Sequence, residues 1–170
     1  LFIKVINDLD IVEVGDKQVD YLMEKYKSEN VNTYKAYFED FKSNKKYDLI
    51  FSATAFHWVD ATVGYPKVWD MLNDSGVLAV FWHMSSVTLH DTGIFVGLNE
   101  IKKKYLPEES LGFDKEGIEG VRQKRISQIQ SGNYFGIPVI KEYRWIDTYD
   151  ADRYSLLLES YSSTQTLDEE

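Results

Sequence analysis

The residues best suited to chemistry follow an apolar run in the first half of the chain. The run consists of Leu49, Ile50 and Phe51, and it is typical of a strand buried on both faces. Strands of a parallel sheet present their carboxyl ends to a ligand crevice, so we expect function in the residues that come next. Ser52 and Ala53 are small enough to leave room for a bound group. The alternative is a buried strand that runs into a packed turn.

An aromatic turn comes soon after these small residues. Phe56 and Trp58 could offer ring faces to a positively charged group. His57, between them, could orient a substrate or act as a general base. A single His beside aromatic side chains is more often a packed, hydrogen-bonded residue. A structural role for His57 is therefore the alternative.

A carboxylate near the start of the chain is the second candidate. Glu13 lies at the end of a predicted strand over residues 10–14. An acid at the carboxyl end of the second strand of a dinucleotide-binding sheet accepts both hydroxyls of a ribose. Asp16 is a competing assignment, and a solvated carboxylate is the alternative for Glu13. Glu13 is the preferred ribose ligand.

Alternating strands and helices must position these groups. Apolar residues at i, i+3, i+4 and i+7 predict a helix over residues 17–27, and Pro66 suits the first turn of another over 65–73. Further strands are predicted at residues 31–37 and 77–82. This alternation predicts an α/β fold, with a Rossmann-like, mostly parallel open sheet and helices on both faces.

The second half of the chain departs from this alternation. Asp91 can cap a helix that stops at Pro107, and a second helix is predicted over residues 115–130. Two helices with no strand between them favour an inserted helical lid. An alternating pattern then predicts a half-covered strand over residues 138–149, and Asp150 can cap a final helix.

These elements predict three parts of the chain. Residues 1–86 form a Rossmann-like cofactor-binding core, residues 87–134 form the lid insertion, and residues 135–170 form a strand and helix that return to the core.

Composition excludes several classes of function. The net charge of −9 argues against nucleic acid or an anionic membrane as a partner. The chain has no Cys, which excludes disulfides, thiolate zinc sites and Cys nucleophiles. His83 and His90 lack nearby carboxylates at ligand spacing, so we predict no metal site. No apolar run approaches the roughly 20 residues that span a bilayer, and no signal peptide pattern is present, so we expect a cytoplasmic protein.

Two sequence motifs resemble a known family. The first is Tyr-Asp-Leu-Ile-Phe-Ser-Ala-x-Ala-Phe-His-Trp-x-Asp at residues 47–60, and the second is Leu-Asn-Asp-Ser-Gly-Val-Leu-Ala-Val-Phe-Trp at residues 72–82. Together they are similar to the fourth strand, its loop and the fifth strand of class I S-adenosylmethionine-dependent methyltransferases. The trans-aconitate type, which acts on small molecules, is the most similar branch. The resemblance covers Ile11 to Trp82 and, more loosely, Pro138 to Glu170.

The resemblance implies S-adenosyl-L-methionine as the cofactor and methyl transfer to a small-molecule acceptor. Glu13 matches the acid that binds the ribose. An acid usually precedes the loop that meets the adenine, but here that position is Tyr37. Phe38 could stack on the adenine ring and offer its backbone N–H instead, and the alternative is that its ring only seals the edge of the sheet. The implied cofactor residues are Glu13, Phe38, Glu39, Ser52, Ala53 and Trp58; the implied acceptor side is Trp82, His83 and Tyr161, with His57 as the catalytic candidate.

The sequence lacks two parts that the family carries. The sequence contains no Gly-x-Gly-x-x-Gly motif, and the family's first strand with its Gly-rich loop and its last strand are missing. We therefore expect a fragment or the ordered part of a longer chain. A second copy in a homodimer is the other way to complete the sheet. Two rival functions remain open: a nicotinamide-dependent oxidoreductase and a non-catalytic interaction domain of the same fold.

Overall fold

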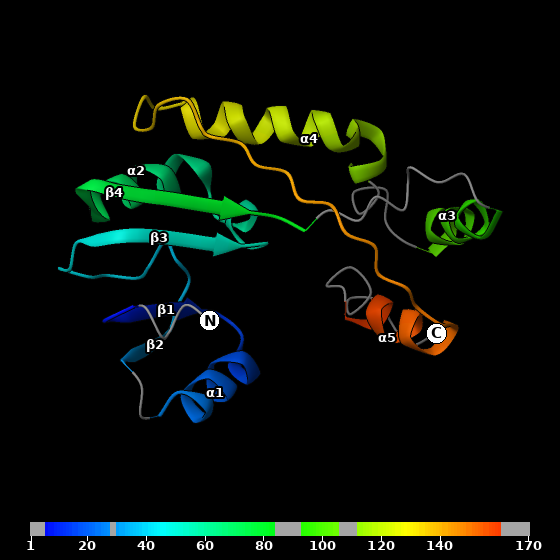
Figure 1. Ribbon diagram of the computed structural model, residues 1–170, viewed down its shortest axis with the longest axis horizontal. Helices are drawn as coiled ribbons and strands as arrows, with labels where there is room; N and C mark the ends of the chain where they lie inside the picture. The colour runs from blue at the N-terminus through cyan, green and yellow to red at the C-terminus, as the bar shows by residue number, and fades with distance from the viewer. Residues whose placement is uncertain (1–5, 28–29, 84–92, 106–111, 161–170) are drawn as a thin grey trace. The chain divides into compact units, whose positions relative to one another are not determined.

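The computed structural model describes residues 6–27, 30–83, 93–105 and 112–160 (Figure 1). The chain divides into two compact units. The first unit contains residues 1–82 and 129–136, and the second contains residues 83–128 and 137–170. No helix within the described ranges is both long enough and apolar enough to cross a membrane.

A βαβ unit opens the first unit. It consists of β1 (Leu9–Glu13), α1 (Asp16–Lys25) and β2 (Val31–Lys35). The two strands pair in parallel, from Leu9 opposite Val31 to Glu13 opposite Lys35. Helix α1 buries Val19, one residue of the predicted apolar face. The strand, the helix and the second strand predicted for this part of the chain are therefore confirmed. Each of their ends lies within two residues of the predicted end.

A second parallel pair follows it. β3 (Tyr47–Ala53) leads through the 3-10 turn η2 (Phe56–Trp58) and helix α2 (Ala61–Met71) into β4 (Leu72–Phe81). Figure 1 shows β3 and β4 side by side with the same direction, and Ala53 lies opposite Phe81. The structure is therefore of the mixed α/β class, with two parallel two-stranded sheets in the described residues.

Two details of α2 and β4 correct the predictions. The helix begins earlier than expected because the Asp60 carboxylate accepts a hydrogen bond from the Thr62 N–H at 2.8 Å and caps the helix there. Pro66 consequently lies inside the helix, not in its first turn. Gly76 lies inside β4, where a Cβ would stand 2.8 Å from the Tyr47 carbonyl oxygen. The glycine therefore permits a close approach of two strands, and β4 begins at Leu72, before the predicted residue 77.

An aromatic core holds α2 against the β3–β4 sheet. Its buried members are Phe56, Tyr65, Val68 and Leu72. Phe135, from residues 129–136, packs against this cluster with its ring 6.2 Å from that of Tyr65. The core of the first unit therefore includes a segment that comes much later in the sequence.

The second unit is helical. It contains α3 (Gly93–Tyr105), most of α4 (Gly112–Gln130) and α5 (Ala151–Glu159). The predicted helices are therefore present, although Asp91 lies outside the described residues. Helix α4 is interrupted at Gly117, where φ is 65°. The cap predicted for the last helix is confirmed, since Asp150 Oδ1 accepts from the Arg153 N–H at 2.8 Å.

The strand predicted over residues 138–149 is wrong. Residues 138–150 have no regular secondary structure. Val139 and Ile146 are 86% and 93% exposed, so neither face of the segment is covered. Alternation of apolar side chains predicts a strand only where a neighbouring strand takes up the backbone N–H and C=O groups. No described strand pairs with this segment.

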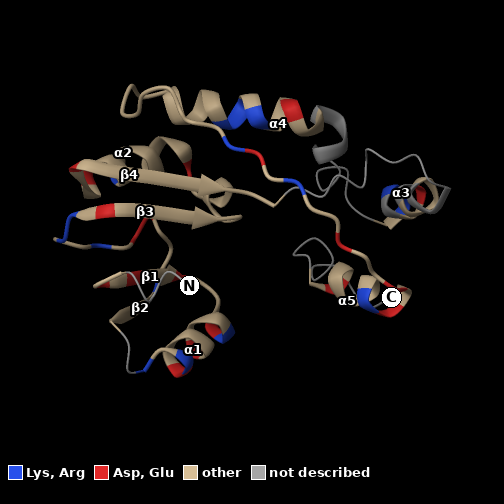
Figure 2. Cartoon of the chain, in the orientation of Figure 1, with Lys and Arg blue, Asp and Glu red and all other residues tan. Residues whose placement is uncertain are grey.

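A polar cluster joins the amino ends of the two sheets. We call it the Asp10 cluster: Asp8, Asp10, Asn32, Lys45 and Tyr47. The Tyr47 hydroxyl donates to Asp10 Oδ2 at 2.6 Å, and Lys45 Nζ donates to Asp10 Oδ1 at 3.0 Å. Asn32 Nδ2 donates to the same Oδ1 at 2.8 Å. Figure 2 shows the basic turn before β3 beside acidic residues on β1 and β3.

The Asp10 carboxylate is charged and almost fully enclosed. Its side chain is 3% exposed. Burial raises the pKa of Asp10, but hydrogen bonds from Tyr47, Asn32 and Lys45, with the charge of Lys45, outweigh burial and leave that pKa below its ordinary value. Burial and the bond to Asp10 raise the pKa of Tyr47. The cluster therefore favours an ionised Asp10 in the folded protein.

We predict that Asp10→Asn lowers the free energy of unfolding by about 2 kcal/mol at pH 7, since three hydrogen bonds lose their charged acceptor. The folded pKa is depressed, so this stabilisation is present above the unfolded pKa and is lost as pH falls through the folded pKa. Urea unfolding at pH 7 and pH 3 should show the difference between wild type and variant shrinking in acid. Asp74→Asn, an exposed carboxylate on β4, is the control. A pH-independent difference would contradict the role of the charge.

Candidate functional site

The carboxyl ends of the strands meet at one rim of the first unit. The Asp10 cluster fixes the amino ends of β1 and β3 together. At the other end, the Phe38 ring, beyond β2, lies 6.1 Å from the ring of Phe56, beyond β3. Glu39 Oε1 also accepts from the Asp60 N–H at 3.1 Å. The residues that follow β1, β2, β3 and β4 therefore share one side, which we call the carboxyl rim.

Glu13 stands at this rim, at the last position of β1. Its side-chain Oε1 accepts from the N–H groups of Val14 and Gly15 at 2.8 Å and 2.9 Å. These bonds hold the half-buried carboxylate at the turn that leads into α1. An ionised carboxylate has about four acceptor sites, so two used sites leave capacity for ligand hydroxyls. Asp16, the competing residue, forms an ion pair with Lys35 instead.

The loop after β2 is clamped to α2 by a lysine. Lys67 Nζ donates to the carbonyl oxygens of Glu39, at 2.8 Å, and Phe41. It also lies 5.2 Å from the centre of the Phe38 ring. Burial lowers the pKa of Lys67, although the charges of Asp40 and Glu39 oppose that shift. The clamp fixes the loop that carries Phe38 and Glu39.

Both predicted residues of this loop already have protein partners. Phe38 is half-buried against the core cluster, and the carboxylate of Glu39 bonds the residue before α2. The sequence pattern carried no signal for Lys67, because its two acceptors are backbone carbonyls more than 20 residues away in the chain.

The turn after β3 begins with a strained residue. Ser52 is half-buried and Ala53 is the last residue of β3. Thr54 has φ of 49°, a left-handed conformation that is rare for a β-branched residue, while its N–H donates to the Phe81 carbonyl at 2.9 Å. Such strain persists where the surrounding structure fixes it, and it is concentrated at functional sites. Sequence analysis missed Thr54 because Gly or Asn is the usual signal for this conformation.

The aromatic turn brings two predicted residues together. Trp82 Nε1 donates a hydrogen bond to His57 Nδ1 at 3.2 Å. The ring of Trp58 lies 5.0 Å from that of His57. Both His57 and Trp58 are exposed, and Trp58 is 73% exposed. The structure therefore places an exposed imidazole between two indoles at the carboxyl rim.

The structure does not place the other two residues predicted for the acceptor side at this rim. His83 is the first residue of the second unit, where its ring stacks on Trp145 at 5.2 Å. Tyr161 lies outside the described residues. Among the described residues, no group of three His, Asp or Glu side chains could hold a metal ion.

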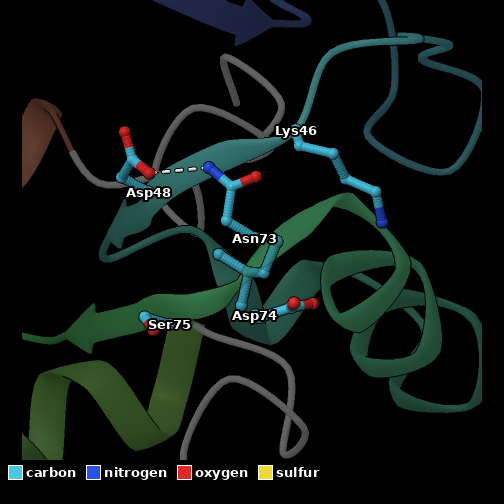
Figure 3. A pocket seen from close by; sticks show the side chains of 6 residues that line it. Lys46, Asp48, Asn73, Asp74 and Ser75 are labelled. Atoms are coloured by element: carbon cyan, nitrogen blue, oxygen red, sulfur yellow. Dashed lines mark hydrogen bonds between the residues drawn. The ribbon is translucent and has the colours of Figure 1, made fainter.

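Two cavities lie away from the rim. One, of about 370 Å³, opens at the amino ends of β3 and β4, where Asn73 Nδ2 donates to Asp48 Oδ1 at 2.6 Å (Figure 3). The other, of about 440 Å³, lies beside α1 and β2. The first is lined by Lys46, Asp48, Leu72, Asn73, Asp74 and Ser75. No predicted site residue lines either cavity.

Comparisons with protein-family models, with curated proteins and with solved structures found no match for this chain. Its function is therefore inferred from the carboxyl rim and from the motifs that lead into it.

We predict that Thr54→Gly raises the free energy of unfolding by about 1 kcal/mol, because glycine adopts a positive φ without strain. The matched control is Ser52→Gly, two residues earlier in extended β3, which should lower stability by about 0.5–1 kcal/mol. Urea unfolding of both variants measures the difference. Destabilisation by Thr54→Gly would mean that its side chain contributes more than its conformation costs.

Proposed function

We propose that this chain is the cofactor-binding part of a class I methyltransferase, which transfers a methyl group from S-adenosyl-L-methionine to a small-molecule acceptor. One observation carries the proposal. Glu13, the loop after β2 and the aromatic turn after β3 lie at one rim, on the side where open α/β sheets bind ligands. The choice of this family rests on the motifs at residues 47–60 and 72–82, which resemble its fourth and fifth strands.

A Rossmann-like sheet accounts for the separation of the two strand pairs. No ladder joins β1 to β3 among the described residues, although their amino ends are joined through Asp10 and Tyr47. A further parallel strand between β1 and β3 would give one five-stranded sheet. The resemblance implies such a strand, with a Gly-rich loop beyond it. A longer polypeptide or a second copy of the chain could supply it.

Two side chains at the rim are suited to a nucleoside that carries a cationic sulfur. Glu13 offers free acceptor sites for ribose hydroxyls. Exposed Trp58 offers a ring face for cation–π attraction to a sulfonium. Phe38 and Glu39 are engaged by the core and by Asp60, so their contribution is the fixed backbone of the loop.

S-adenosyl-L-methionine supplies, when bound, a methyl group activated by positively charged sulfur. The chain's own task is to align the acceptor and exclude water, which requires position more than strong acid or base. His57 and Trp82 lie on the acceptor side in this proposal.

We predict that the full natural polypeptide binds S-adenosylhomocysteine and that Glu13→Gln weakens binding at least about tenfold, because bonds to a charged acceptor are lost. Isothermal titration calorimetry measures both constants. Glu24→Gln, an exposed carboxylate on α1, is the control and should bind as wild type does.

Two results would contradict the proposal. Failure of the full polypeptide to bind S-adenosylhomocysteine favours a non-catalytic domain. Binding of a nicotinamide dinucleotide in its place favours an oxidoreductase.

A further inference from the structure

The segment that leads into α5 exposes a run of large apolar side chains. It consists of residues 137–149, within the second unit, and has neither a turn nor a bend from residue 138 onward. Figure 1 shows it as an extended trace. Seven of its large apolar side chains are exposed: Ile137, Val139, Ile140, Tyr143, Trp145, Ile146 and Tyr149. A contiguous run of this kind marks an interaction surface.

The backbone of this segment has no partner within the described residues. None of the backbone hydrogen bonds between described residues involves residues 137–149. Side chains anchor the segment to its own unit, since Glu142 Oε2 accepts from Arg122 Nη2 at 2.6 Å and the ring of Trp145 stacks on that of His83 at 5.2 Å. An extended segment with unpaired N–H and C=O groups is a template for one more strand.

The order of charges in the segment selects a partner and a register. When two copies of one segment pair antiparallel about a twofold axis, opposite side chains share a face, so the central residue must lie opposite itself. A charged residue at the centre would face its own like charge, which excludes Lys141, Glu142, Arg144 and Asp147. Of the remaining centres, only Tyr143 brings opposite charges together, because Glu142 then faces the partner's Arg144.

The same register pairs apolar side chains on both faces of the ladder. On one face, Ile140 lies opposite the partner's Ile146. On the other face, the two Tyr143 rings lie opposite each other, and Lys141 lies opposite the partner's Trp145. Aromatic pairs, aliphatic pairs and opposite charges are the cross-strand pairs that stabilise sheets.

The charged pairs form a closed alternating set. Glu142 and Arg144 lie two residues apart and therefore share a face of the strand. Within the described residues, Arg144 uses only its Nε, which donates to Glu142 Oε1 at 2.6 Å. Four of the five guanidinium N–H donors are left for the partner's carboxylate. Each carboxylate thus has a guanidinium beside it both along the strand and across the ladder.

Pro138 distinguishes the two edges of the segment. In an antiparallel ladder, alternate residues direct their N–H and C=O groups to the same neighbour. Proline has no N–H, so the edge made by even-numbered residues lacks a donor at residue 138. Pairing through the odd-numbered residues, with Tyr143 at the centre, keeps every donor in the ladder. The proline then lies on the outer edge, where it opposes the addition of a third strand.

We propose that residues 137–149 are a dimerisation strand, which pairs antiparallel with the same residues of a second copy of this chain about a twofold axis at Tyr143. The second copy provides the neighbouring strand that the alternating pattern of this segment requires. This pairing is independent of the proposed methyltransferase function, and it uses a different part of the chain from β1 and β3.

The first experiment tests the register by cross-linking. The chain has no Cys, so introduced cysteines give no background. Ile140→Cys and Ile146→Cys are purified separately and mixed under oxidising conditions. In the proposed ladder these two positions face each other in a pair without hydrogen bonds, with Cα atoms about 4.5 Å apart, which is within disulfide range. We expect a disulfide-linked dimer from the mixture.

The controls come from the same segment. Each variant alone should give little cross-linking, because residue 140 lies about 20 Å along the ladder from residue 140 of the partner. Ile137→Cys mixed with Ile146→Cys should also give little, since these positions lie about 10 Å apart along the ladder and on opposite faces. Equal yields in all mixtures, or no dimer from Ile140→Cys with Ile146→Cys, would overturn the proposal.

The second experiment tests the charged pairs by sedimentation velocity. We expect wild type to dimerise with a Kd between about 1 and 100 μM. Arg144→Glu places two carboxylates opposite each other on both sides of the axis and should raise Kd at least about tenfold. Lys103→Glu, an exposed residue of α3, changes the net charge equally and should leave Kd within about twofold.

The results of sedimentation have clear meanings. Wild type that stays monomeric up to about 1 mM, or an equal rise of Kd in both variants, would overturn the proposal. Circular dichroism verifies that each variant is folded, and the cross-linking test does not depend on Arg144→Glu. Since neither readout involves a cofactor, failure to bind S-adenosylhomocysteine would contradict only the methyltransferase proposal.

Discussion

The first unit depends on one enclosed carboxylate. Asp10 is where a strand of one parallel pair is joined to a strand of the other, through the Tyr47 hydroxyl and the Lys45 ammonium. A charge with a 3% exposed side chain would be costly without partners, and here hydrogen bonds take up both of its oxygens. The alignment of the strands, and hence the shared direction of their carboxyl ends, depends on this contact.

The opposite ends of the strands are held by different means. The Phe38 and Phe56 rings, the Glu39 bond to the Asp60 N–H and the Lys67 clamp hold the loop after β2 against α2. Apolar packing, a hydrogen bond from the residue before α2 and a lysine thus all act on the same loop. The result is a rim whose backbone is fixed while the side chains of His57 and Trp58 remain exposed. A binding site needs this combination of a rigid base and accessible groups.

Local patterns were sufficient to predict part of this arrangement. The apolar run at Leu49 predicted the position of β3, but the prediction that this strand is buried on both faces is wrong, since Leu49 and Phe51 are 39% and 38% exposed. The spacing around Val19 predicted α1, because strand and helix periods are properties of neighbouring residues. The position of Glu13 at the end of β1 followed in the same way. His57 and Trp82 were each predicted at the site, but their mutual bond was not, since it joins residues 25 apart in the chain.

The features that could not be predicted depend on distant contacts. The Lys67 clamp and the Asp10 cluster join residues from separate elements, and no local pattern marks either of them. The positive φ of Thr54 has no glycine to signal it. The segment at 138–149 shows the converse, since its alternating side chains follow the strand period while its backbone has no described partner.

The packing of residues 129–136 determines how this protein can be divided. Phe135 contacts both Tyr65 and Trp69, although the chain leaves the first unit after Trp82 and returns only at Ile129. Cutting the chain after β4 would remove Phe135 from α2 and expose the Tyr65 ring, which is now 4% exposed. The first unit expressed alone would therefore need residues 129–136, joined by a linker after Trp82.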